Sequence, residues 1–290
     1  MGTTTRTSPF CSEGLSLDTP IYRIHPQRFL GKLLSGQLFL PATSRWTDPY
    51  ENLISRAGYT FLGDDNLIKQ VFVGGDRLPT FGQCWTTIAE SDALWRIYSE
   101  VDKSIGSSSS FFPYEGVRLR TTPRKLVNCL ADGMGSGNED KCCISAVRYL
   151  NENDLQAHVG NAIHTHREKA FSGISGHADG LTLKREPFRH ESEVRLLYID
   201  ADRRFAGKDG IEVPIDANAV IEEIMLDPRT IGRWRTKAQR VARSERFQEH
   251  DYHLESIPRD YLASTPRTVK RLVSLTLCRS RAVGNFNMEV

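Results

Sequence analysis

The sequence predicts an α+β fold: a single domain in which mixed or antiparallel sheets carry packed helices. Strand-like alternation and helical 3.6-residue spacing both occur along the chain, without the regular strand-helix-strand order of α/β proteins. No internal repeat is present. The 290 residues are 39% hydrophobic and 26% charged, which is typical of globular proteins that bury a sizeable core.

The first predicted unit is a strand followed by a helix. Residues 21–24 alternate as a short strand, and Pro26 suits the first helical position because its missing N–H costs nothing there. Apolar residues at helical spacing follow, and Gly36 supplies a left-handed cap. A second short strand is expected at 38–41, and the polar and aromatic segment 44–51 is expected to be a loop.

The rest of the chain switches irregularly between the two periodicities. Ser91 or Asp92 is expected to cap a helix that carries Leu94 and Tyr98 on one face. The other expected strands are residues 81–86, 116–120, 143–150, 193–199, 220–226 and 269–278. The other expected helices are residues 123–130, 151–170 and 231–247, and a surface loop is expected at 131–141.

The two ends of the chain are expected to lie outside the domain. Residues 1–20 are rich in Thr and Ser, lack the hydrophobic segment of a signal peptide, and are expected to be a flexible lead-in. The α+β domain is expected over 21–279 and a tail over 280–290.

Composition and charge argue against several classes of function. No apolar run approaches the ~20 residues that span a membrane, so no membrane partner is expected. Six cysteines without regular spacing do not make a disulfide framework, which indicates a reducing, cytoplasmic compartment. Thirty-eight basic and 36 acidic residues give a formal charge of +2, too balanced to demand nucleic acid as a partner. The basic residues of 231–247 suit phosphates, or simply a solvated helix face.

Several short segments follow one another in a recognisable order. They are residues 22–36; Trp46-Thr47-Asp48-Pro49-Tyr50-Glu51; Cys84-Trp85-Thr86; Leu94-Trp95-Arg96-Ile97-Tyr98; Gly116-Val117; Val147-Arg148-Tyr149; Lys184; Glu191-Ser192-Glu193-Val194-Arg195; and Glu223-Ile224-Met225-Leu226-Asp227-Pro228. Their order resembles the domain of unknown function 2971 family, a bacterial group, over residues 21–277. Thr47 and Asp227 depart from that pattern, where the family has Asn and Gly.

The same order is similar to that of ADP-ribosyltransferases of toxins and defence systems, whose first strand carries Arg or His and whose later strand begins with Glu. This resemblance implies a split sheet and an enzyme that uses NAD as a substrate. It implies a toxin or anti-phage effector that modifies nucleic acid or protein. The alternative is a non-enzymatic sensor module that binds a nucleotide or a phage component.

Two carboxylates are the candidate catalytic groups. Cleavage of the nicotinamide bond of NAD passes through a sugar cation, which a carboxylate beside the ribose stabilises. Glu193 opens a predicted strand, and Glu191 lies two residues before it, so regular alternation puts both on one face. Both carboxylates are equally explained as ion-pair partners of Lys184, Arg189 or Arg195.

Basic and aromatic residues complete the predicted NAD pocket. Arg23 is the candidate anchor for a diphosphate or ribose, with His25 as its rival on the same strand face. A surface salt bridge is the alternative role for either residue. The other predicted binding residues come from the loop at 44–51 and from the aromatic positions: Arg45, Trp46, Asp48, Tyr50, Glu51, Trp85, Trp95 and Tyr98. Core packing explains Trp95 and Tyr98 equally well, since they sit at helical spacing.

No metal site is expected. His164 and His166 point to different sides of a helix, and Cys142 and Cys143 lack a second cysteine pair, which argues against zinc. A nuclease needs clustered acidic metal ligands, and only the pairs Asp48 with Glu51 and Glu191 with Glu193 offer them.

Overall fold

The computed structural model describes residues 15–26, 29–46, 78–99, 116–166 and 170–227, and the backbone of strands at 10–11, 58–62 and 68–72. The predicted helix at 231–247 and the predicted strand at 269–278 lie outside these residues. No helix of the described part of the chain combines the length and apolar character needed to cross a membrane.

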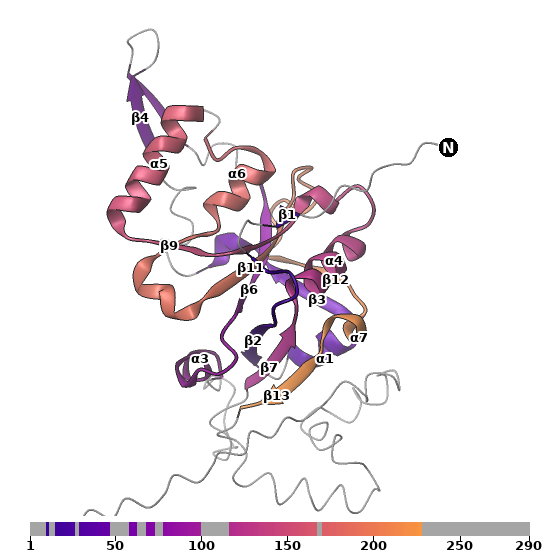
Figure 1. The fold of residues 1–290 in the computed structure, drawn as a ribbon. Coiled ribbons are helices and arrows are strands. Elements are labelled where there is room, and N and C mark those ends of the chain that lie inside the picture. The colour runs from indigo at the N-terminus through magenta and orange to yellow at the C-terminus, as the bar shows by residue number, and fades with distance from the viewer. Residues whose placement is uncertain are drawn as a thin grey trace, which may run out of the picture.

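The central element is a seven-stranded mixed sheet with the strand order β1-β8-β11-β6-β2-β7-β13. Its strands are β1 (Phe10–Cys11), β2 (Ile21–Pro26), β6 (Thr80–Thr86), β7 (Gly116–Thr121), β8 (Cys142–Ala146), β11 (Glu193–Ile199) and β13 (Glu223–Leu226). β1 is parallel to β8, and all other neighbours are antiparallel. Helices pack on this sheet, which confirms the predicted α+β class (Figure 1).

Three two-stranded sheets accompany it. They pair β3 (Gln37–Pro41) with β12 (Gly210–Pro214), β9 (Arg148–Leu150) with β10 (Leu183–Arg185), and β4 (Gly58–Leu62) with β5 (Ile68–Phe72). The first of these continues the main core, because Leu38, Leu40, Ile211 and Val213 belong to it.

Helices cover both faces of the central sheet (Figure 1). One face, which carries the largest apolar cluster, is covered by α1 (Leu30–Leu34), α4 (Pro123–Met134) and α7 (Ala217–Val220). The other face packs on α6 (Gly173–Gly180), and a smaller cluster forms around α5 (Glu152–His166). α3 (Asp92–Tyr98) packs against β2.

Local signals explain how these elements begin and end. Ser91 caps α3 by accepting a hydrogen bond from the N–H of Leu94, and Thr122 caps α4 in the same way, followed by Pro123 at the first helical position. The turn after α1 contains Gly36 at φ 90°, a conformation that glycine adopts without a steric cost. The predicted caps at Ser91 and Gly36 are confirmed.

Four predicted boundaries are wrong, and at Pro26 and Val147 strand pairing overrides the local pattern. Pro26 is the last residue of β2, where it pairs with Gly116, and α1 begins only at Leu30. The expected strand at 143–150 breaks at Val147, and its second half joins another sheet. The expected strand at 220–226 begins only at Glu223, and Val220 is the last residue of α7. α4 runs into the expected loop at 131–141 and ends at Met134.

Part of the predicted lead-in belongs to the fold. Residues 10–11 form β1 at the edge of the central sheet, and Leu15 and Leu17 pack on the main core. Arg124 on α4 fixes this segment, because its backbone N–H donates to the carbonyl of Leu17 and its guanidinium pairs with Asp18 at 2.8 Å.

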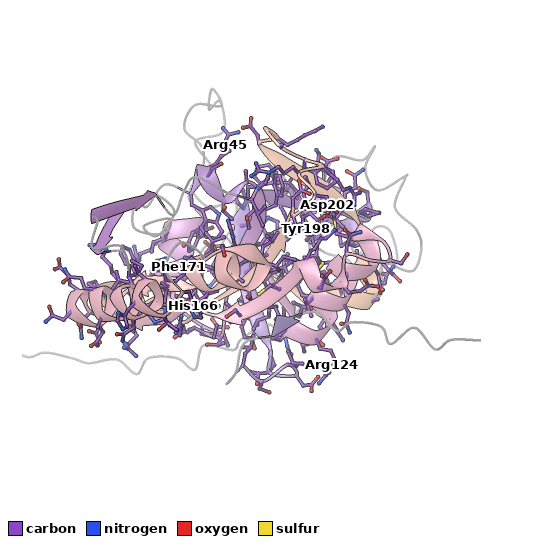
Figure 2. All side chains as sticks on the ribbon, turned by 90° about the horizontal axis from the view of Figure 1, so that it is seen from above. Arg45, Arg124, His166, Phe171, Tyr198 and Asp202 are labelled. Carbon is purple, nitrogen blue, oxygen red and sulfur yellow. The ribbon has the colours of Figure 1, made fainter. Side chains whose placement is uncertain are left out.

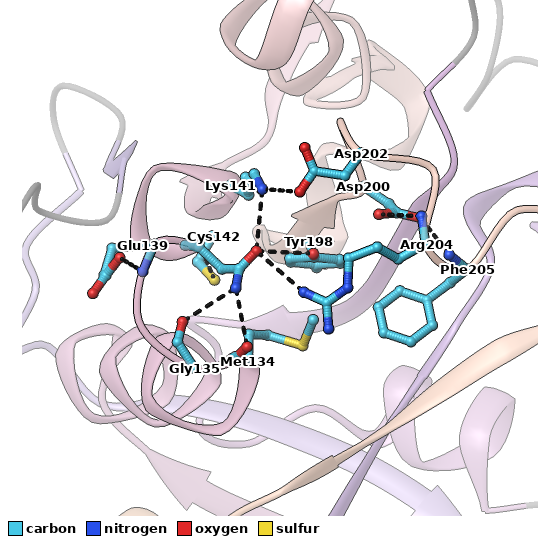
Figure 3. A network of polar contacts seen from close by, with 12 residues as sticks. Met134, Gly135, Glu139, Lys141, Cys142, Tyr198, Asp200, Asp202, Arg204 and Phe205 are labelled. Atoms are coloured by element: carbon cyan, nitrogen blue, oxygen red, sulfur yellow. Dashed lines mark hydrogen bonds and ion pairs between the residues drawn. The ribbon is translucent and has the colours of Figure 1, made fainter.

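A buried polar network ties the turn after α4 to the end of β11 (Figure 3). The Nδ2 of Asn138 donates to the carbonyls of Met134 and Gly135, at 3.1 and 3.2 Å. Its Oδ1 accepts from Lys141 at 3.2 Å and from Arg204 at 3.5 Å. The side chain therefore satisfies carbonyls at the helix end that otherwise lack a partner.

We predict that Asn138→Ala lowers the free energy of unfolding by ~1–3 kcal/mol, because the hydrogen bonds of this buried side chain to Met134, Gly135 and Lys141 are lost. Chemical denaturation at neutral pH measures this change. Asn153→Ala on the exposed face of α5 is the matched control and leaves stability nearly unchanged. Equal midpoints for the two variants contradict a stabilising role for the network.

Candidate functional site

The central sheet splits between β2 and β6. Tyr22 and Thr86 form the one registered pair between these strands. Beyond that pair β2 follows β7 along its whole length, whereas β6 follows β11. The two strands therefore part, and the backbone of β6 from Gly82 to Trp85 has no pairing with β2.

A cavity of about 470 Å³ occupies this split. Seven of the predicted site residues line it: Arg23, Arg45, Trp46, Trp85, Tyr98, Glu191 and Glu193. The volume is in the range of pockets that hold small ligands, ~300–1,000 Å³.

The cavity is lined from both faces of the sheet. Paired residues of antiparallel strands share a face, so Tyr22, Thr86 and Glu193 lie on one face. Arg23 and Trp85 alternate to the other face. All five line the same cavity because it opens where the strands separate.

Glu193 is buried at the start of β11 and is held by two cations. Its carboxylate accepts two hydrogen bonds from Arg195, from Nε at 2.9 Å and from Nη2 at 3.1 Å. The Nζ of Lys184 donates a third at 3.2 Å. Burial alone raises the pKa of Glu193, but the charges of Arg195 and Lys184 outweigh it and hold the pKa below its ordinary value.

Glu191 contacts Lys184, the same cation that donates to Glu193. Its Oε2 lies 2.6 Å from the Nζ of Lys184, and its side chain is largely buried. Arg189 pairs instead with Glu186, at 3.2 Å on the exposed side of the turn. Of the three ion-pair partners considered from the sequence, Lys184 and Arg195 contact the carboxylates.

Trp46 stacks on the cation that clamps Glu193. Its ring lies 4.5 Å from the guanidinium carbon of Arg195, which is a favourable cation–π distance. Gly82 lies beside this ring: a Cβ there would be 3.4 Å from Trp46 and would collide with Leu197 and the carbonyl of Leu196. Arg45, next to Trp46, extends outward and pairs with Asp209 at 2.8 Å (Figure 2).

The guanidinium of Arg23 has a buried hydrogen-bond donor that no described residue accepts from. Its Nη1 has no hydrogen-bond partner among the residues that the structure describes. Burial lowers the pKa of the guanidinium, and the neighbouring Cys84 and Tyr98 act in the opposite direction. A charged donor without a partner in a cavity is a candidate contact for an anionic ligand.

Two predicted site residues do not line the cavity. His25 lies further along β2, its Nδ1 is 3.0 Å from the carbonyl oxygen of Pro26, and burial lowers its pKa to about 3. The imidazole is therefore neutral at physiological pH. Trp95 is buried on α3 but lies outside the cavity lining, since one residue along a helix turns the side chain away from the face of Leu94 and Tyr98.

Three other predicted residues, Asp48, Tyr50 and Glu51, lie outside the described residues. The cavity instead contains residues that were not predicted as site residues, among them Tyr22, Gln83, Cys84, Lys184 and Phe188. Alternation in the strand at 81–86 could have indicated Cys84, which shares its face with Gly82 and Thr86. No local pattern marks Phe188, which reaches the cavity from the 3-10 turn Glu186–Glu191.

The site holds more cations than anions. Arg23, Arg45 and Lys184 line the cavity together with Glu191 and Glu193. Arg195 pairs with Glu193 from behind the lining, and Arg45 pairs with Asp209, so one positive charge is in excess once these pairs are counted. Within the described ranges, no group of three or more His, Cys, Asp or Glu side chains could hold a metal ion. The arrangement favours an anionic organic ligand.

The sequence matches no family model and no curated protein. Among solved structures it is similar to the Thermus sp. 2.9 protein DarT in complex with NAD+, at 13% identity, over 79% of this chain and 89% of that chain, with a TM-score of 0.29. It is also similar to the same protein in complex with ADP-ribosylated ssDNA, at 13% identity, over 81% and 93% of the two chains, with a TM-score of 0.29. At such TM-scores the likeness carries no weight on activity, so the interpretation rests on the site itself.

We predict that the buried cluster makes stability depend on pH through Glu193. Because its pKa in the folded protein lies below the ordinary 4.5, its stabilising contribution is present above pH 4.5 and is lost as the pH falls through the folded pKa. Glu193→Gln therefore destabilises the protein at pH 7 and flattens the fall in stability on acidification. Thermal unfolding from pH 3 to 7 measures both effects.

Glu186→Gln is the control, because its pair with Arg189 is exposed and contributes little. A Glu193→Gln profile that parallels the parent profile at every pH argues against the buried ion pair.

Proposed function

We propose that this protein is an ADP-ribosyltransferase that binds NAD in the cavity of the split sheet. The observation that carries the proposal is the convergence of Arg23 and Glu193 on one cavity. The order of the sequence segments supports the same activity. Its role is that of a toxin or anti-phage effector that modifies nucleic acid or protein.

Arg23 is the anchor for the diphosphate of NAD. Its buried Nη1 lacks a partner among the described residues, and a guanidinium binds phosphate oxygens through charge-assisted hydrogen bonds. A diphosphate also supplies the negative charge that the excess cation of the site requires.

The aromatic side chains give NAD its flat contacts. Trp46 and Tyr98 are partly exposed on the cavity, whereas Trp85 is buried and belongs to the main core. Rings that present a free face can stack on nicotinamide or adenine. The backbone of β6 from Gly82 to Trp85, which does not pair with β2, adds N–H and C=O groups, which are suited to a carboxamide.

Glu193 is the carboxylate that stabilises the reacting sugar. When the bond from C1′ to the nicotinamide nitrogen breaks, its electron pair leaves with nicotinamide and positive charge develops on the ribose. A nucleophilic atom of the acceptor then bonds to C1′, and its proton passes to solvent. A carboxylate that stays ionised lowers the energy of the cationic sugar and can accept a hydrogen bond from a ribose hydroxyl.

One observation favours a second candidate, a non-enzymatic nucleotide-binding sensor. Both oxygens of Glu193 already accept hydrogen bonds from Arg195 or Lys184, so part of its charge is neutralised. In such a module the cavity binds the nucleotide and the bond to nicotinamide stays intact. Measurement of nicotinamide release separates the two functions.

We predict that Arg23→Met weakens NAD binding ~10- to 100-fold, because one charged hydrogen-bonding contact is lost. Glu193→Gln is expected to bind NAD and to release nicotinamide ~100- to 1,000-fold more slowly. Calorimetry measures binding, and labelled NAD with single-stranded nucleic acid or protein acceptors measures turnover.

Arg96→Met is the matched control, since Arg96 is exposed on α3 and pairs with Asp92 at 2.5 Å. Equal turnover by the parent and Glu193→Gln removes Glu193 from the catalytic role. NAD binding by the parent without nicotinamide release favours the sensor, and no binding at all rejects both candidates.

A further inference from the structure

A third residue of the cavity wall connects the two carboxylates. Lys184 lies on β10 and is 6% exposed. Its Nζ is 2.6 Å from Oε2 of Glu191 and 3.2 Å from Oε2 of Glu193. One ammonium group therefore bridges both candidate catalytic carboxylates.

The backbone fixes where this ammonium lies. β10 runs parallel to β9, and Lys184 pairs with Tyr149 in that register. The hydroxyl of Tyr149 in turn accepts a hydrogen bond from the backbone N–H of Glu193 at 2.8 Å. The ring of Phe188 lies 4.8 Å from the Nζ of Lys184 and closes the other side. Lys184 thus lies in the small sheet of β9 and β10, and Tyr149 of the same sheet also fixes the backbone of Glu193.

The carboxylates need this cation to stay ionised together. Since both contact the same Nζ at 2.6 and 3.2 Å, their oxygens lie within ~6 Å of each other, and like charges so close disfavour double ionisation. Arg195 offsets the charge of Glu193 from the same strand. The other titratable groups that face the cluster come from four elements and are Arg23, Cys84, Tyr98 and Tyr149. Burial raises the pKa of Tyr149 to about 12, so this phenol adds no charge at neutral pH.

We propose that Lys184 is a positioning residue that holds Glu191 and Glu193 ionised and in a fixed arrangement on one wall of the cavity. The inference deepens the proposed function and rests on it for the meaning of these carboxylates. Without the ammonium, the repulsion between the two carboxylates is no longer offset, and one of them takes up a proton more readily. The wall then loses negative charge where a cationic sugar would form.

We predict that Lys184→Met raises the titration midpoint of one carboxyl of the pair by ~1 pH unit or more, as expected for two interacting acids. Carbon NMR of protein labelled at the glutamate carboxyl carbons measures this without ligand, and Glu191→Gln and Glu193→Gln assign the two signals. In an enzyme that releases nicotinamide, the acid limb of the pH-rate profile moves upward in the same direction. Lys184→Arg restores both readouts towards the parent values.

Lys184→Gln separates charge from hydrogen bonding, because an amide still donates but carries no charge, and it serves as the test if Lys184→Met does not fold. Lys32→Met is the matched control, since that exposed lysine pairs with Glu212 at 2.7 Å and does not line the cavity. Unchanged carboxyl midpoints in Lys184→Met or Lys184→Gln overturn the inference. If the parent releases no nicotinamide, the titration still decides the role of Lys184, so the two failures are distinguishable.

Discussion

The buried guanidinium of Arg195 imposes the charge arrangement on which the site depends. Its side chain is 0% exposed, and a charge removed from water must be paired and hydrogen-bonded to be tolerated. Glu193 meets that need because residues two apart on a strand share a face. The carbonyl of Leu181 accepts a further hydrogen bond, and Trp46 covers the guanidinium. The need of the buried Arg195 guanidinium for a paired carboxylate therefore explains the position of Glu193 as well as ligand binding does.

The split of the sheet follows from the competing partners of its two middle strands. β2 is held by six registered pairs with β7, and β6 by seven with β11, whereas a single pair joins β2 to β6. Each strand follows its better-paired neighbour, so the sheet opens after Tyr22 and Thr86. The cavity is thus a product of backbone pairing, and side chains from both faces reach it at the point where the strands part.

Much of the fold is predictable from local patterns, because alternation and capping act over a few residues. The strands at Ile21–Pro26 and Glu193–Ile199 and the cap at Ser91 follow from such signals. The break at Val147 does not, because its N–H bonds to the carbonyl of Glu193, far away in the sequence. α6 and β10 also escape prediction: α6 contains few apolar residues, and the three residues of β10 form a strand through their pairing with β9.

The site shows why a residue pattern alone could not separate a structural role from a functional one. Regular alternation was expected to put Glu191 and Glu193 on one strand face, but Glu191 ends the 3-10 turn and Ser192 between them has a φ of 42°. Both carboxylates still contact Lys184, and either an ion pair or a reactive site explains such residues. The structure contains the ion pairs, at the wall of a cavity. Arg23 shares that cavity although alternation puts it on the other face, which no periodicity predicts. Lys184 and Arg195 balance the negative charges of the two carboxylates. The positive charge of Arg23 is then left for a ligand to neutralise, and an anion bound there would supply the missing negative charge.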